Sequence, residues 1–209
     1  MIKAIVPPLQ PRKTPIQARS AVTVAAILEA AIQVLLAEGK ERLTTTRVAA
    51  RAGVSVGTLY QYFPNKSSLL QTVLKQHLDA VATAVETACR KVHGEPLQQM
   101  AEALIAAFVH AKFQHIHASA ALYSISDDVE GRRIAQAMHA RAAKAITAML
   151  RTAPGRPVRE PASVAETLLG AMTGISRSML ETGARPNVQA TMEQELMTLA
   201  RAYLAVSAA

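Results

Sequence analysis

Apolar residues recur at helical spacing along most of the chain, and this pattern predicts an all-α fold of about nine helices. The first predicted helix covers residues 20–38 and ends at Gly39, a residue suited to the left-handed position after a helix. A second long pattern begins at Lys66 and continues to about Val92. The inward positions are Val24, Ile27, Leu28, Ala31, Val34 and Leu35 in the first helix, and Leu69, Leu70, Val73, Leu74, Leu78, Val81 and Val85 in the second.

Prolines, glycines and acidic caps divide the remaining chain into shorter predicted helices. A Pro- and Gly-rich loop at residues 154–157 separates the last two from the others. These helices run from Pro96 to about His117, around residues 120–125, from Asp127 or Asp128 to about Arg151, from Pro161 to Gly183, and over residues 187–206.

Residues 44–66 contain two short helical patterns separated by a tight turn. Thr45 is expected to cap the first helix, and Ser55 the second. Gly53 supplies the turn because a residue without Cβ takes positive φ at little cost, and Pro64 ends the second helix. A helix–turn–helix of this kind places its second helix in the DNA major groove.

The second helix of this pair has a distinctive predicted surface. Leu59 and Phe63, four residues apart, face inward together. Small residues at the N-terminal end permit close approach to base edges, and a helix N-terminus favours phosphate. The same pattern is also typical of an ordinary helical hairpin with aromatic residues in a core. The outward or flanking positions are Val56, Gly57, Thr58, Gln61 and Tyr62.

The stretch also carries a dense set of residues at fixed spacing: Thr45, Val48-Ala49, Ala52-Gly53-Val54-Ser55, Gly57-Thr58-Leu59-Tyr60, Tyr62-Phe63, Lys66 and Leu69-Leu70. In these residues the chain resembles the DNA-binding domain of TetR-type transcriptional repressors, over roughly residues 20–75. The resemblance implies an all-helical homodimer with an N-terminal DNA-binding domain. It also implies a larger C-terminal domain that binds a small molecule and pairs with a second subunit.

On this interpretation the recognition helix and its flanks divide into two groups of contacts. Thr45, Tyr60, Tyr62 and Lys66 are expected to hold phosphates, beside the cap residue Ser55. Val56, Gly57, Thr58 and Gln61 are expected to meet base edges. Because Val56 cannot hydrogen-bond a base, part of its contact would be with a thymine methyl group.

Positive charge is concentrated in the N-terminal third of the 209-residue chain. Residues 1–66 hold nine Lys and Arg against three acidic residues, a net charge of +6, whereas residues 67–209 contribute only +2. A basic patch indicates a polyanionic partner, although it is also compatible with a solvated or membrane-surface patch. We expect a flexible basic arm at 1–19, a helix–turn–helix domain at 20–66, and a ligand-binding and dimerisation domain at 67–209.

Composition narrows the class of protein further. The single cysteine, Cys89, cannot form an intrachain disulfide, so a cytoplasmic location is expected, and its helical context favours buried packing. No stretch of eighteen residues is free of charge, so no membrane-spanning helix is expected. The segment Met1–Val6 is too short for the apolar region of a signal peptide.

Candidates for a ligand cavity fall in the C-terminal two thirds of the chain. His110, Gln114 and His117 would share one face of the fifth helix, where they could line a pocket, bind metal, or be ordinary hydrogen-bonded histidines. The spacing lacks a zinc-peptidase pattern, and no metal or cofactor is expected. The apolar candidates, which could equally be plain core, are Met100, Phe108, Phe113, Tyr123, Met138 and Met172, with Ser176 beside them.

The last two predicted helices combine apolar and small residues, which permit close helix approach. They are candidates for a four-helix bundle made by two subunits. Internal packing within one subunit is the alternative. The candidate interface residues are Val164, Leu168, Gly170, Ala171, Gly174, Met192, Leu196, Leu199 and Tyr203.

The sequence therefore predicts a dimeric regulator that binds a palindromic DNA operator and is released by a small apolar or aromatic effector. Two other classes stay open at this point. One is a helical enzyme with a His-lined cavity, although no nucleophile–base–acid set is visible. The other is an architectural DNA-binding protein without a ligand.

Overall fold

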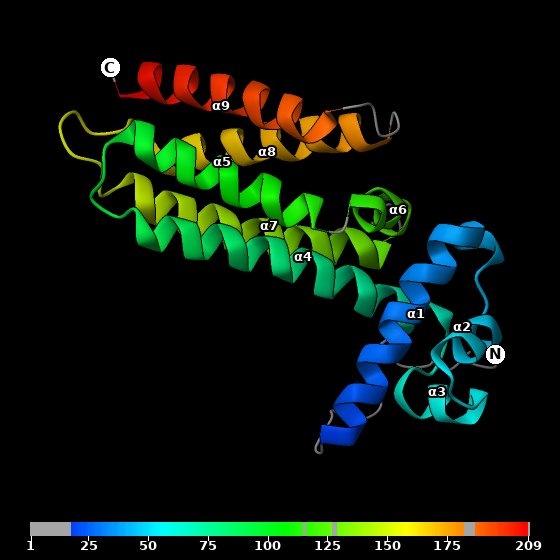
Figure 1. Cartoon of the computed structure of the whole chain (residues 1–209). Helices are drawn as coiled ribbons and strands as arrows, with labels where there is room; N and C mark the ends of the chain where they lie inside the picture. Colours follow the sequence, from blue (N-terminus) through cyan, green and yellow to red (C-terminus); the bar gives the residue numbers. More distant parts are fainter. Residues whose placement is uncertain (1–17, 115, 127–128, 182–186, 209) are drawn as a thin grey trace, which may run out of the picture. The chain divides into compact units, whose positions relative to one another are not determined.

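The computed structural model describes residues 18–114, 116–126, 129–181 and 187–208, and the regular elements among them are all α-helices (Figure 1). This confirms the predicted all-α class. The helices are α1 (Ala18–Arg42), α2 (Thr45–Ala52), α3 (Val56–Tyr62), α4 (Lys66–Lys91), α5 (Leu97–Phe113), α6 (Ile116–Ser126), α7 (Val129–Leu150), α8 (Pro161–Glu181) and α9 (Val188–Ser207).

The chain divides into two compact units. One comprises Met1–Gln76 with Ala121–Ile134, and the other comprises His77–Ala120 with Ala135–Ala209. Helix α4 contributes residues to both, since its bounds cross the division at Gln76. The predicted arm at 1–19 and the predicted caps Asp127 and Asp128 lie outside the residues whose side chains the structure describes.

In the N-terminal unit α1 packs on α2, and α2 packs on α3. Gly39 interrupts the helical backbone of α1 with a φ of 78°, so the predicted stop at this residue is confirmed. Of the apolar positions predicted for the first helix, all but the half-buried Val24 lie in the core of this small unit, together with Leu69, Leu70, Val73 and Leu74 of α4. Its fully buried residues include Ile27, Leu43, Val48, Ala49, Leu59, Phe63 and Leu69.

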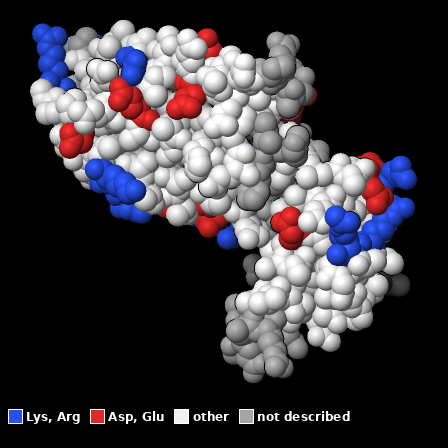
Figure 2. Space-filling model, in the orientation of Figure 1, with Lys and Arg blue, Asp and Glu red and all other residues white. Residues whose placement is uncertain are grey.

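In the C-terminal unit α9 packs against both α5 and α8. Met100, Leu104 and Ile105 of α5 are fully buried, as are Leu196 and Ala200 of α9. Such burial contributes roughly 1.5–3 kcal/mol for each large apolar side chain. Figure 2 shows several Lys and Arg close together on part of the N-terminal unit, and acidic residues lie near basic ones on both units.

The fifth helix is shorter than predicted. It ends at Phe113 rather than near His117, and His117 belongs to α6 instead. The hydroxyl of Ser119 in α6 donates to the carbonyl of Lys112 at 2.8 Å, which satisfies a carbonyl at the end of α5. The prediction that His110, Gln114 and His117 share one helix face is therefore wrong.

In the described part of the chain, the helix Ser20–Arg42 is long and apolar enough to cross a membrane, judged by length and composition alone. This differs from the expectation of none, because a single charged residue such as Glu29 does not disqualify a window. Only 33% of that window is buried, yet the helix packs on α2 as part of the helix–turn–helix unit. The apolar residues of this helix therefore contribute to the core of that unit.

Candidate nucleic-acid interface and effector cavity

The first helix of the pair is capped by Thr44, not by Thr45 as predicted. Thr44 has an extended backbone and its hydroxyl accepts a hydrogen bond from the N–H of Arg47 at 3.3 Å. A cap residue must lie outside helical φ and ψ, which Thr44 satisfies and Thr45, the first helical residue, does not. The Thr45 hydroxyl instead contacts the Tyr60 hydroxyl at 3.0 Å.

The turn between α2 and α3 forms as predicted. Gly53 adopts a φ of 67°, and its N–H bonds back to carbonyls of α2. The N–H of Val54 donates to the carbonyl of Ala49 at 3.0 Å. Ser55 then caps α3: its hydroxyl accepts the N–H of Thr58 at 3.0 Å and lies 2.8 Å from the Thr58 hydroxyl. The chain thus reverses in a few residues and α3 starts with a satisfied N-terminus.

Helix α3 has a buried side and an open side. Leu59 and the cap residue Phe63 are buried, so the predicted inward pair is confirmed. Val56 is 36% exposed and Tyr60 is 41% exposed, although both are large and hydrophobic. The other outward residues are Gly57 and Gln61, which are exposed, and Thr58 and Tyr62, which are half-buried. Large apolar groups left in water beside hydrogen-bonding ones indicate a contact surface.

Two of the expected phosphate-binding groups also hold the unit together. Tyr60 links α3 to the start of α2 through Thr45. The ammonium of Lys66 donates to the carbonyl of Lys40 at 2.5 Å, which joins the start of α4 to the end of α1. An ammonium has three donors, so this bond leaves Lys66 able to bind a phosphate as well.

The C-terminal unit contains a cavity of about 440 Å³, in the range of about 300–1,000 Å³ typical of ligand pockets. Helices α4, α5, α7 and α8 supply its walls, which are mostly apolar. The lining residues are Leu78, Val81, Ala82 and Val85 of α4; Phe108 and Lys112 of α5; Ala135, Gln136, Met138, His139, Ala140 and Ala142 of α7; and Glu166, Leu169 and Thr173 of α8.

Of the residues predicted from sequence to bind a ligand, Phe108 and Met138 line this cavity. Met100, Met172, Tyr123 and Ser176 are buried, and they are not among its lining residues. His110 and Gln114 are exposed, with their side-chain nitrogens 3.0 Å apart. Phe113 is half-buried outside the lining, and the side chain of His117 lies outside the described residues.

The polar residues that line the cavity were not predicted from the sequence. Lys112 follows Phe108 by four residues and Leu104 by eight, so helical spacing alone places this lysine on the buried face of α5. It is 3% exposed, and burial lowers its pKa to about 8. His139 and Glu166 come from different helices and meet at 2.7 Å, a pairing that no local spacing could have indicated.

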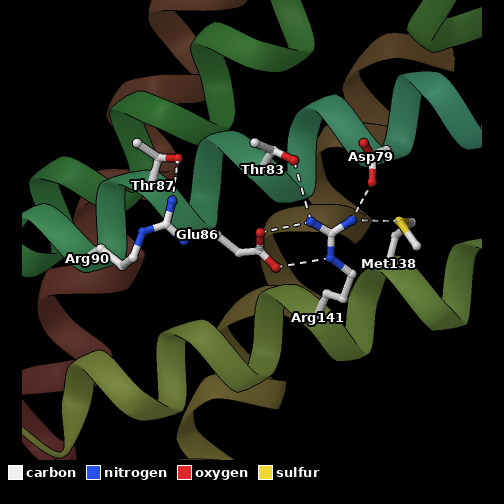
Figure 3. A network of polar contacts seen from close by, with 7 residues as sticks. All are labelled: Asp79, Thr83, Glu86, Thr87, Arg90, Met138 and Arg141. Atoms are coloured by element: carbon white, nitrogen blue, oxygen red, sulfur yellow. Dashed lines mark hydrogen bonds and ion pairs between the residues drawn. The ribbon is translucent and has the colours of Figure 1, made fainter.

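An ion-pair cluster joins α7 to α4 next to the cavity residue Met138 (Figure 3). The Arg141 guanidinium donates two hydrogen bonds to Glu86, at 3.0 and 2.8 Å, and a further one to Asp79. These bonds hold the pKa of Glu86 below its usual value, chiefly through hydrogen bonding to Arg141. The two-pronged contact fixes the register of α7 on α4 more than it stabilises the fold, because the groups are partly exposed.

Other side chains that could be reactive or bind metal are either buried and unreactive or far from one another. Cys89 is buried, and desolvation raises the pKa of its thiol to about 12, which suits packing and not nucleophilic attack. Among the residues whose side chains are described, no three His, Cys, Asp or Glu side chains are grouped as metal ligands would be.

The residues predicted to form the dimer interface differ in how exposed they are within one chain. Val164, Leu168, Met192 and Leu196 are buried in their own subunit. Gly170 and Gly174 of α8 are exposed, and a Cβ added at either would meet no atom within 4 Å. Ala171, Leu199 and Tyr203 are half-buried. The small residues of α8 thus leave an open strip beside a well-packed α8–α9 pair.

The architecture is that of a helix–turn–helix unit joined to a helical unit with an apolar cavity. Family models agree with it over most of the chain. The model for bacterial regulatory proteins of the tetR family matches residues 27–73, and the model for the tetracyclin repressor-like C-terminal domain matches residues 96–204. The chain belongs to the TetR family: it is a helix–turn–helix DNA-binding transcription regulator with a ligand-binding C-terminal domain. The family predicted from the sequence is confirmed.

The individual proteins that are similar in sequence match only part of the chain. The chain is 35% identical over 72 residues to the nucleoid occlusion factor SlmA of Haemophilus ducreyi, covering 34% of this chain and 36% of the relative. It is 33% identical over 91 residues to the transcriptional repressor BepR of Brucella suis, covering 44% of each. The matches thus span less than half the length of these curated relatives.

A solved structure assigned to the TetR family, from Mesorhizobium loti MAFF303099, superposes with a TM-score of 0.72. It is 22% identical in sequence, and the match covers 91% of this chain and 98% of that one. At this identity the likeness concerns the fold alone. The agreement in fold extends over nearly the whole length of the chain.

Proposed function

We propose that this regulator is a repressor that binds a palindromic operator as a homodimer. The open surface of α3 carries the proposal, because Val56, Tyr60 and Gln61 stay in water on a short helix whose other side is fully buried. The net charge of +6 in residues 1–66 supplies sequence-independent attraction to phosphate. We assign DNA binding to residues 20–66, and ligand binding and dimerisation to residues 67–209.

Gln61→Ala should relax the preference for particular base pairs, at a cost of about 1–3 kcal/mol on the preferred sequence. Lys66→Ala should instead weaken binding to all DNA alike and lower the salt dependence by about one unit per subunit. Fluorescence anisotropy on DNA from upstream of the chain's own gene, and on point variants of it, measures both effects.

The matched control is Gln194→Ala, which removes the same side chain from an exposed position of α9. It should bind every fragment as the wild type does. Equal loss of affinity on all sequences for Gln61→Ala and Lys66→Ala would contradict the division into base and phosphate contacts.

We further propose that a small apolar or aromatic molecule enters the cavity and releases the operator. The ligand need not touch DNA; it needs only to bind the DNA-incompetent state more tightly. Helix α4 supplies four cavity residues, and its first turns belong to the unit that holds α3, so a shift of this helix is the proposed route. Moving the population from 1:99 to 99:1 requires a preference of about 10⁴-fold.

Thr173→Phe should abolish this response while leaving operator binding intact, because Thr173 lines the cavity and a phenyl ring would fill part of its volume. Ala148→Phe, at an exposed position of α7 away from the cavity lining and from the exposed strip of α8, is the control and should respond normally. Compounds that raise the melting temperature of the wild type and release labelled DNA provide the readout. A compound that still releases Thr173→Phe at the wild-type concentration would rule out this cavity.

A further inference from the structure

The walls of the cavity differ in how far they are exposed to solvent. Val85 of α4 and Phe108 of α5 line the cavity and are buried. Three polar lining residues on α7 and α8 are exposed or half-buried instead: Gln136, His139 and Glu166. We call these three residues the rim, because they belong both to the cavity lining and to the surface of the protein. The cavity thus combines an apolar interior with a polar rim.

Glu166 gives this rim a negative charge. Its Oε2 atom lies 2.7 Å from Nε2 of His139, and its side chain is 57% exposed. A carboxylate has two oxygens that together accept about four hydrogen bonds, so this one contact leaves room for a further donor. Glu166 is the single acidic residue among the described residues that line the cavity. A ligand that reaches the rim from inside the cavity therefore meets an acceptor.

The positively charged lining residue lies at a different depth. Lys112 of α5 is 3% exposed, its Nζ atom lies 5.8 Å from the centroid of the Phe108 ring, and it takes part in further contacts within the protein. Lys112 belongs to the buried interior, whereas Glu166 belongs to the rim. The selection of a polar head group at the rim therefore depends on Glu166.

We propose that the effector is an amphipathic amine, whose apolar body fills the cavity and whose ammonium binds Glu166 at the rim. A charged head group inside the apolar interior would lose its hydration at a large cost, whereas at the exposed rim it keeps part of its water. There an ammonium forms charge-assisted hydrogen bonds with the carboxylate of Glu166. A carboxylate head group at the same place would be repelled by a like charge. This inference rests on the proposed effector role of the cavity.

Calorimetric titration of the full-length chain at about pH 7 with four probes tests the proposal. 2-Naphthylmethylamine and octylamine represent aromatic and aliphatic amines, and 2-naphthalenemethanol and 1-octanol are their neutral counterparts. At least one amine should bind about fivefold or more tightly than its alcohol, as expected for a charge-assisted contact that is partly exposed. The pair with the larger preference identifies the aromatic or the aliphatic source.

Glu166→Gln keeps the shape of the side chain and removes its charge. It should reduce the amine-to-alcohol ratio to about one while leaving the affinity for the alcohols within about threefold. The matched control is Glu95→Gln, which removes the same charge from an exposed position between α4 and α5 outside the lining and should behave as the wild type.

Equal binding of amine and alcohol by the wild type, an unchanged preference in Glu166→Gln, or no binding of any probe overturns the proposal. If the chain binds DNA specifically in those cases, the amine inference alone has failed; if it does not, the proposed function has failed as well.

Discussion

Gly174→Arg should convert the proposed dimer into monomers and abolish tight operator binding. Gly174 is exposed on α8 with no atom near an added Cβ, so the arginine fits one subunit without strain. In a dimer packed through this strip, the new charge would be buried without a partner, at a cost of about 3–5 kcal/mol. At about 1.4 kcal/mol for each tenfold change, that corresponds to a dissociation constant for the dimer raised from roughly 10²-fold to several thousand-fold.

Sedimentation velocity at micromolar concentration measures the change directly. Ala148→Arg, at an exposed position of α7, introduces the same charge elsewhere and should remain dimeric. Leu196→Glu is a poor substitute, because Leu196 is fully buried in its own subunit and the change would unfold the chain. A wild type that sediments as a monomer, or a dimeric Gly174→Arg, would remove α8 from the interface.

Lys112→Met should stabilise the chain at neutral pH, and the gain should shrink as the pH rises. The pKa of Lys112 is about 8 in the folded chain, against an ordinary value of 10.5. Below pH 8 the lysine is protonated in both states, so folding bears the full cost of the buried charge. Between about pH 8 and 10.5 the unfolded chain binds more protons than the folded chain, and wild-type stability therefore rises with pH.

The full window corresponds to about 3 kcal/mol, and the part between about pH 7 and pH 9.5 to about 2 kcal/mol. Urea unfolding of wild type and variant at one fixed protein concentration gives this difference, since dimerisation also affects apparent stability. Lys144→Met, at an exposed position of α7, should show no such trend. A stability difference between Lys112→Met and wild type that does not change with pH would mean that Lys112 keeps an ordinary pKa in the folded chain.

The helix–turn–helix was predictable because its signals are local. Gly53 needs positive φ, Ser55 needs a free N–H within three residues, and Leu59 with Phe63 needs only helical spacing. The misplaced cap shows the limit of such signals. In a run of three threonines the side chain is the same at each position, so only the backbone angles distinguish the cap residue Thr44 from Thr45.

The cavity was less predictable because four helices distant in sequence form it. Periodicity identifies an inward face but does not tell whether that face meets another side chain or an empty volume. Phe108 and Met138 line the cavity, whereas Met100 and Met172, equally apolar, are fully buried outside its lining. Lys112 could have been found, since a lysine on an otherwise apolar helix face is uncommon.

The most direct test of the whole account is to select DNA with the purified chain from a pool of genomic fragments, then to footprint the selected site. The selected site should be an inverted repeat whose half-sites are one helical turn apart, roughly 34–36 Å, or a multiple of it. Each half-site should be protected by one α3, and subunits should bind in even numbers. Enrichment of no common sequence, or protection of a single asymmetric site by one subunit, would contradict it.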